Sequence, residues 1–158
     1  QLDGDDWLAH KEVLMKVANV YKDSNVWMTY GNYRTEPRNK KGVCVADYPK
    51  QVVTNLSFRK YPWRDGPLRT FYAALFQKIP MEDFLYKGEF VRAAHDVVFG
   101  FPMLEMASKG HFRCIKKVLY IYNVANPISD FRAASGMQGE VAGVVCQKPP
   151  YKPLETLF

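Results

Sequence analysis

The sequence predicts a fold of the α/β or α+β class, on three observations. Apolar residues recur at helical spacing in some segments and as β-branched and aromatic runs in others, so helices and strands are expected to alternate. No internal repeat or low-complexity tract is present. The 158 residues, 47% of them hydrophobic, suffice for one buried core. Residues 1–158 are therefore expected to form a single domain.

The first half of the chain contains two regular elements and two loops. Residues 10–21 place apolar side chains on one face of a helix. Residues 26–33 mix β-branched and aromatic residues, which is typical of a strand. The polar segments 34–42 and 61–67 contain proline and glycine, and we expect both to be surface loops.

The second half is dominated by apolar segments. Residues 68–77 predict an amphipathic helix, and residues 102–108 predict a second helix with a proline in its first turn. The run V-L-Y-I-Y at residues 118–122 is the strongest strand signal in the chain. Residues 138–146 are expected to form a short helix, and the proline-rich residues 148–154 an extended segment.

Charge and cysteine content limit the classes of function. The 22 Lys and Arg residues outnumber the 16 Asp and Glu residues, and the net charge of +6 is compatible with a polyanionic partner. Cys44, Cys114 and Cys146 are odd in number and far apart, which fits neither a disulfide framework nor a zinc site. We therefore expect a reducing, cytoplasmic location. No run approaches the roughly 18 apolar residues that a membrane-spanning helix needs.

Three aspartates lie within four positions of the segment L-D-G-D-D-W-L, residues 2–8. On an extended backbone, residues two apart face the same way, so Asp3 and Asp5 would address one ligand. Their hard oxygens suit Mg²⁺ or Mn²⁺ that also binds substrate phosphates. The alternative is that both are solvated turn residues. Asp6 is expected to cap the helix that follows.

These aspartates resemble the D-x-D region of family 2 glycosyltransferases, which have the GT-A fold. Further motifs agree with that family in order and spacing: P-L-R-T-F-Y at residues 67–72, A-H-D-V-V-F-G-F-P-M-L-E-M-A-S at residues 94–108 and V-L-Y-I-Y-N-V-A-N-P-I-S-D-F-R at residues 118–132. The resemblance implies an α/β, GT-A-like fold with a mixed sheet and flanking helices. It also implies metal-dependent, inverting transfer of a sugar from a nucleotide-diphosphate sugar to an acceptor hydroxyl.

The resemblance assigns roles to three of the aspartates. Asp5 would coordinate Mn²⁺ or Mg²⁺, and Asp3 would hold the nucleotide ribose or the water shell of the metal. Asp96 aligns with the acidic residue that such enzymes use as general base, and is expected just before a helical turn. From the local sequence alone, a helix cap explains Asp96 equally well.

Four further residues are candidates for substrate binding. Arg69 and Arg132 carry guanidinium groups that match phosphate oxygens, although an exposed, solubilising charge is the common alternative for either. Trp63, in a polar loop, is the aromatic residue best suited to stack on a sugar. His95 neighbours Asp96 and would contact substrate, or be a surface residue. Structural roles are expected for Glu105, His10 and His111.

The D-x-D of these enzymes follows a nucleotide-binding βαβ half, whereas here it begins at residue 3. We therefore expect this chain to be the C-terminal part of a GT-A domain, with the N-terminal half from the same or another chain. The expected partners are a nucleotide-sugar donor, a carbohydrate or lipid-linked acceptor and, by peripheral association, an anionic membrane face, but no nucleic acid. Alternative functions are a basic nucleic-acid-binding module and an inactive structural remnant.

Overall fold

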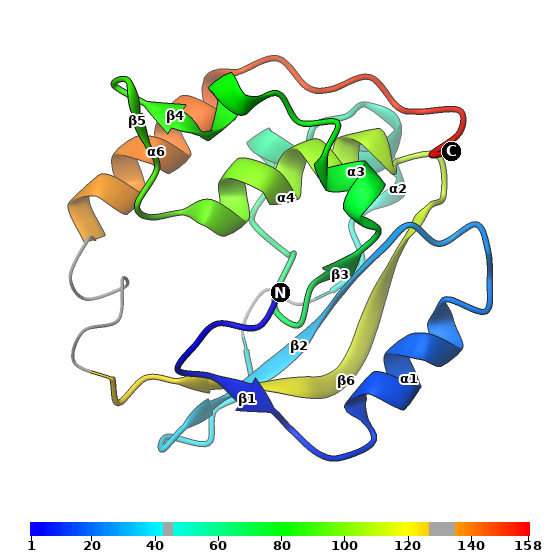
Figure 1. The fold of residues 1–158 in the computed structure, drawn as a ribbon, viewed down its shortest axis with the longest axis vertical. Coiled ribbons are helices and arrows are strands. Elements are labelled where there is room, and N and C mark those ends of the chain that lie inside the picture. The colour runs from blue at the N-terminus through cyan, green and yellow to red at the C-terminus, as the bar shows by residue number, and fades with distance from the viewer. Residues whose placement is uncertain (43–45, 127–134) are drawn as a thin grey trace.

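Two long strands organise the fold. The computed structural model describes residues 1–42, 46–126 and 135–158. Strands β2 (Met28–Glu36) and β6 (Phe112–Asn123) pair in parallel at the centre of a curled sheet with the order β1-β6-β2-β3 (Figure 1). Short strands at the edges, β1 (Trp7–Leu8) and β3 (Thr70–Phe71), run antiparallel to their neighbours. The sheet is mixed and helices flank it, so the expectation of a mixed α/β fold is confirmed at this level.

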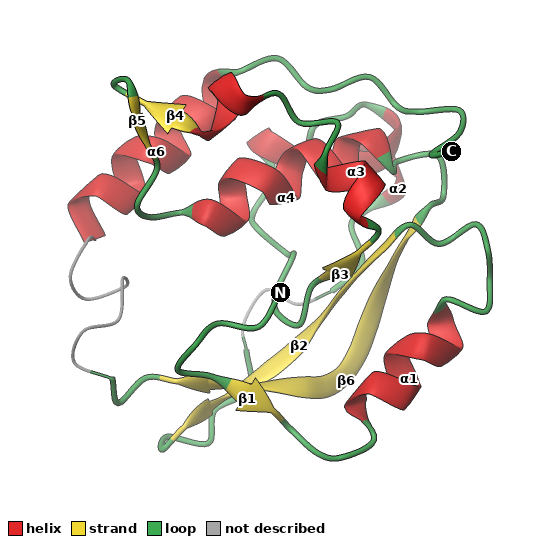
Figure 2. Cartoon of the chain, viewed as in Figure 1, coloured by secondary structure: helices red, strands yellow, loops and turns green. Residues whose placement is uncertain are grey.

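Helices lie on both sides of this sheet (Figure 2). Helix α1 lies on one side, and α3, α4 and α6 lie on the other. The helices are α1 (Val13–Val20), α2 (Lys50–Thr54), α3 (Ala73–Phe76), α4 (His95–Met106) and α6 (Ser135–Gln147). Two 3-10 helices, Phe58–Lys60 and Met81–Phe84, and a hairpin of β4 (Leu85–Tyr86) and β5 (Glu89–Phe90) are the other regular elements among the described residues.

Several predicted elements are confirmed. Helix α1 lies within the predicted range 10–21, and α6 covers the predicted range 138–146. Strands β2 and β6 extend beyond their predicted ranges. In the case of β2, the extension includes the start of the predicted loop 34–42, where Arg34 forms a bridge with Lys41.

The predicted helix over residues 68–77 is wrong in its first half. Thr70 and Phe71 instead form β3, which pairs with Met28 and Thr29 of β2. The Thr70 hydroxyl lies 2.7 Å from the Thr29 hydroxyl, which holds this edge together. Helical periodicity was therefore overridden by pairing with a strand remote in sequence.

Helix α4 begins seven residues before the predicted start at 102. Every residue from Val98 to Met106 is buried, so the helix has no polar face and lacks the periodicity that sequence analysis requires. Pro102, predicted in the first turn, lies inside the helix. An interior proline costs about 3 kcal/mol, which burial on all sides of α4 must offset.

A buried ion pair fastens α4 to the rest of this layer. Arg59 donates to both carboxylate oxygens of Glu105, at 2.6 and 2.7 Å, and also to the carbonyl oxygen of Val145 in α6. Glu105 accepts a further hydrogen bond from the Tyr151 amide. The expected structural role of Glu105 is confirmed, and Arg59, which precedes the exposed Lys60, is itself buried.

Candidate functional site

The side chain of Arg69 joins three parts of the chain. Its Nε lies 3.2 Å from Asp65 Oδ2, and its Nη2 donates to Asp96 Oδ2 at 3.3 Å and to the Asp65 carbonyl oxygen. Its Nη1 donates to Gln1 Oε1 at 3.3 Å. Arg69 follows Pro67 and Leu68 on the way into the edge strand β3, and Asp96 lies in the first turn of α4. The acidic N-terminal segment and α4 therefore meet at one guanidinium.

The charges in this cluster influence one another. Burial disfavours the charged form of Arg69, but neighbouring carboxylates outweigh burial and raise the Arg69 pKa. In order of influence, these carboxylates belong to Asp65, Asp96 and Asp3. Asp3, predicted to bind the donor, is linked to Arg69 through Gln1, which donates to Asp3 Oδ1 and accepts from Arg69 Nη1.

Asp65 is fully buried, with no solvent exposure. Neither of its carboxylate oxygens has a hydrogen-bond partner among the described residues, because the 3.2 Å contact with Arg69 Nε has the distance of an ion pair but not the geometry of a hydrogen bond. Burial raises the pKa of Asp65 to about 6, although Arg69 acts in the opposite direction. The negative charge of Asp96 adds to this increase.

Trp63 and Gly100 complete the surroundings of Arg69 and Asp65. The Arg69 guanidinium lies over the Trp63 ring, 5.5 Å from its centroid, and this ring meets Phe101 edge to face. A methyl group on Gly100 would lie 2.7 Å from Asp65 Oδ2 and 2.8 Å from Trp63, closer than such atoms approach. Glycine at this position of α4 therefore leaves room for both side chains.

Asp96 is the most accessible carboxylate in contact with Arg69, with 33% of its side chain exposed. Its Oδ1 accepts a hydrogen bond from the Val97 amide at 3.0 Å, while Oδ2 receives the contact from Arg69. The N-cap of α4 is Ala94, which has a left-handed backbone with φ 60°. Asp96 was expected just before a helical turn and lies within the first one. Its predicted role as general base stays a prediction.

The segment that precedes β1 is a turn rather than an extended strand. The Asp6 amide donates to the Asp3 carbonyl oxygen at 3.2 Å, so the expectation that Asp3 and Asp5 share one face of an extended backbone is wrong. Asp3 Oδ1 accepts from Gln1 Nε2, and Asp5 Oδ2 accepts from Asn126 Nδ2. Since β1 is antiparallel to β6, this turn lies at the carboxyl end of β6.

Asp6 does not cap a helix, contrary to the prediction, since α1 begins at Val13 with Glu12 as its N-cap. Its buried carboxylate accepts hydrogen bonds from the Tyr120 hydroxyl at 2.6 Å and the Asn123 amide at 2.7 Å. Burial raises the pKa of Asp6, although both hydrogen bonds oppose the increase. Asp6 therefore fastens residues 3–6, which we call the acidic turn, to the end of β6.

The remaining candidates lie outside the cluster or outside the described residues. His95 is exposed, and its Nε2 lies 3.0 Å from the Val91 carbonyl oxygen. Arg132 and Cys44 lie outside the described residues. Within residues 1–42, 46–126 and 135–158, no three or more His, Cys, Asp or Glu side chains form a group that could hold a metal by itself.

Sequence analysis missed Asp65 and Gly100. It treated residues 61–67 as a surface loop, but Asp65 and Gly66 are buried there. The only signal was an acidic residue four positions before Arg69, which could have suggested an ion pair. That spacing is too common to identify a site without the fold.

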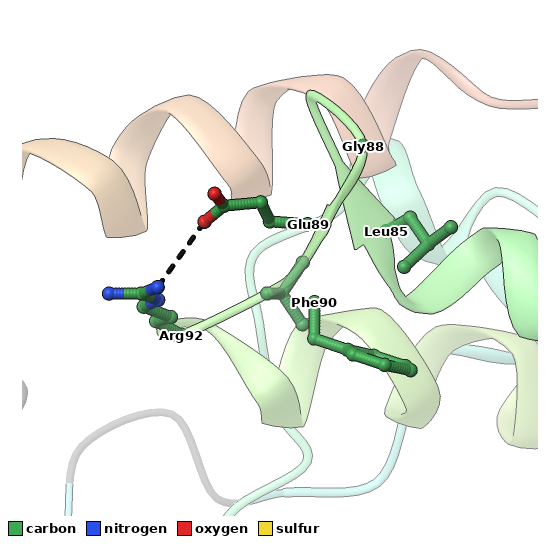
Figure 3. Close-up of a pocket in the computed structure, with 6 residues that line it drawn as sticks. Leu85, Gly88, Glu89, Phe90 and Arg92 are labelled. Carbon is green, nitrogen blue, oxygen red and sulfur yellow. Dashed lines mark hydrogen bonds and ion pairs between the residues drawn. The ribbon is translucent and has the colours of Figure 1, made fainter.

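An open hollow of about 390 Å³ lies apart from this cluster, at the β4–β5 hairpin (Figure 3). Leu85 and Phe90 line it, and Arg92 forms an ion pair with Glu89 at 3.3 Å along its edge. None of the residues that surround Arg69 line this hollow.

The described helices are all too short or too polar to cross a membrane. No family model matches the sequence, and no curated protein matches it either. A functional assignment must therefore come from the residues themselves.

Proposed function

We propose that this chain belongs to a family 2 glycosyltransferase with the GT-A fold, which transfers a sugar from a nucleotide-diphosphate sugar to an acceptor hydroxyl. The observation that carries the proposal is that Arg69 contacts Asp96 directly and is linked to Asp3 through Gln1, which accepts from Arg69 and donates to Asp3. The position of the acidic turn adds support, because ligands in open α/β sheets bind beyond the carboxyl ends of parallel strands.

The acidic turn would bind the donor. Asp3 is exposed and Asp5 is half-buried, and each accepts a hydrogen bond at one carboxylate oxygen. Two such carboxylates suit Mg²⁺ or Mn²⁺, which retains water and takes its other ligands from substrate phosphates. When bound, the cation would stabilise the charge of the departing diphosphate. The Asn126 amide holds Asp5, and Asp6 holds the turn on β6.

The acceptor would bind on the side of Asp96. As the acceptor oxygen bonds to the anomeric carbon, the bond from that carbon to the diphosphate breaks and its electron pair leaves with the diphosphate. The Asp96 carboxylate accepts the proton of the acceptor hydroxyl. Asp96 is partly exposed, so an acceptor can reach it. The hydrogen bond that its Oδ1 accepts from the Val97 amide fixes the direction of the carboxylate.

Trp63, Arg69, His95 and Arg132 remain proposed substrate contacts. The half-buried Trp63 is the best placed, because its ring borders Arg69. Arg69 itself is bound by protein carboxylates, so it would act on substrate mainly by holding the two sides of the site together. The proposed acceptor is a carbohydrate or a lipid-linked hydroxyl, and the proposed location is cytoplasmic, with peripheral association at an anionic membrane face.

The alternative, a nucleic-acid-binding module, would rest on the net charge and on two basic runs, residues 58–61 and 116–117, whose surroundings do not favour it. In the first, Arg59 is buried against Glu105. In the second, Lys116 pairs with Asp47 at 2.7 Å. Neither run is therefore a continuous, unpaired cationic stripe of the kind that binds a phosphate backbone.

Thermal unfolding of the complete protein with a panel of nucleotide-sugars tests the proposal. In Mn²⁺, we expect one donor at about a hundredfold excess over its Kd to raise the Tm by roughly 5–10 °C. Asp5→Ala should abolish this increase. Asp96→Asn should retain the increase in Tm but lose sugar transfer, because Asp96 acts on the acceptor and not on the nucleotide-sugar. The exposed Asp23→Asn, whose carboxylate pairs with Arg113, is the control and should behave as the wild type. Absence of any metal-dependent increase in the wild-type protein would overturn the proposal.

A further inference from the structure

Asp65 is the carboxylate in the cluster whose environment is hardest to explain by stability alone. It has no exposure, neither oxygen accepts a hydrogen bond of good geometry from a described residue, and its nearest cation is Arg69 Nε at 3.2 Å from Oδ2. A buried, incompletely paired charge is costly, and such groups in native proteins call for a functional explanation. Asp65 does not face solvent, so it is not itself a substrate contact.

The geometry of Arg69 shows what Asp65 does to its neighbour. One edge of the guanidinium is held by Asp65, through the ion pair at Nε and through the Asp65 carbonyl oxygen at Nη2. Asp96 receives only a long contact, 3.3 Å from the same Nη2. A guanidinium and a carboxylate normally form two parallel hydrogen bonds when nothing restrains them. Arg69 therefore stands in an intermediate position, restrained from a full pair with Asp96.

The surroundings hold Asp65 in the place where it exerts this restraint. Gly100 lies so close to Asp65 Oδ2 that a single added methyl group would have to displace it. Trp63 packs beside Gly100 and under the Arg69 guanidinium. The position of Asp65 is thus set by α4, the same helix that carries Asp96.

We propose that Asp65 is a positioning residue that holds Arg69 away from a full ion pair with Asp96 and so keeps the Asp96 carboxylate available to the acceptor hydroxyl. This inference rests on the proposed function of Asp96. Without the charge of Asp65, the nearest carboxylate to the buried guanidinium is that of Asp96, and Coulombic attraction draws Arg69 onto it.

A crystal structure of Asp65→Asn provides the direct test and needs no activity. We expect Arg69 to move onto Asp96 and form two hydrogen bonds of about 2.8–2.9 Å, in place of the single 3.3 Å contact. If Arg69 keeps its wild-type position in this variant, the inference is wrong. Should Asp65→Asn fail to fold, Gly100→Ala serves instead, because its methyl group displaces the carboxylate without removing the charge.

Kinetics of the complete protein distinguish positioning from a general loss of stability. At a temperature well below the Tm, Asp65→Asn should lower kcat about 10- to 100-fold while the KM for the donor stays within about twofold. In an Asp96→Asn background, the same change should cause no further loss, because the carboxylate that it protects is already absent. Additive losses would contradict the inference.

The control is Asp83→Asn, another aspartate that carries an ion pair, with Lys148 at 2.7 Å. It should leave kcat unchanged, since Asp83 contacts Lys148 and Tyr151 rather than Arg69. Absence of metal-dependent transfer in the wild-type protein would refute the proposed function. It would not refute the restraint of Arg69 by Asp65, because the crystal structure tests that restraint separately. An active wild type with full kcat in Asp65→Asn would refute this inference alone.

Discussion

Two buried arginines in this chain have carboxylate partners of very different quality. Arg59 and Glu105 form a bidentate pair, and main-chain groups from two further segments complete their hydrogen bonding. Arg69 and Asp65 are equally buried, but they meet at 3.2 Å without a good hydrogen bond. The first pair joins helices, whereas the second leaves one edge of its arginine to Asp96.

The difference agrees with a structural role for the first pair and with a place for the second pair in the proposed site. When all the hydrogen bonds of a buried ion pair are made, no donor or acceptor atom remains free to bind another group. A pair with unsatisfied atoms carries a cost that the rest of the fold must offset, and such costs concentrate at functional sites. The contact of the second arginine with an accessible carboxylate agrees with this interpretation.

The largest effect is expected at the satisfied pair. Glu105→Gln leaves Arg59 buried without a counter-ion, and we expect a loss of about 3–5 kcal/mol in the free energy of unfolding, measured in urea. The matched control is Glu155→Gln, whose exposed carboxylate pairs with Lys109, and this change should stay within about 0.5 kcal/mol. Equal effects of the two substitutions would show that the Arg59 pair is not structural.

The next effect concerns the pH dependence of stability at Asp65. Its pKa is raised from 3.8 to about 6, so between these values the folded protein keeps a proton that the unfolded chain releases. Stability from this group is therefore complete below about pH 4 and is lost as the pH rises through 6, by roughly 3 kcal/mol. Asp65→Asn should lack this loss.

Urea unfolding of the wild type and of Asp65→Asn at about pH 4 and pH 7 measures the effect. Other carboxylates titrate in both proteins, so the informative quantity is the change with pH in the difference between their free energies of unfolding. A difference that does not vary with pH would mean that Arg69 compensates fully for the burial of Asp65, and the contrast between the two ion pairs would disappear.

The parts of the fold that sequence predicted are those with one buried face. Helix α1 buries Val13 and Val17 and leaves its other residues exposed or half-buried, so its periodicity is visible. The start of α4 was missed for the opposite reason, since burial on all sides erases the pattern. Strand β3 was taken for a helix because only its pairing with β2, about 40 residues earlier, determines its backbone.

The site was predictable in its residue types but not in its connections. Asp3, Arg69 and Asp96 were identified from motifs, and in the structure Arg69 contacts Asp96 directly and is linked to Asp3 through Gln1. Asp65 was missed because proline and glycine mark its segment as a loop, and loops are expected at the surface. Its burial arises from α4, whose glycine at position 100 accommodates the carboxylate. No local pattern contains a contact between residues 65 and 100.

The smallest predicted effect extends the comparison to Asp6, a buried carboxylate that has a donor at each oxygen. Tyr120→Phe removes the hydroxyl that donates to Asp6 and accepts from the Asp3 amide, and we expect a loss of about 2 kcal/mol. Tyr86→Phe, which loses a hydrogen bond to the exposed Glu140, is the control and should cost at most about 0.5 kcal/mol. Thermal unfolding measures both. If the two variants were equally stable, the position of the acidic turn would not depend on β6. The proposed binding site for the nucleotide-sugar would then lack its structural support.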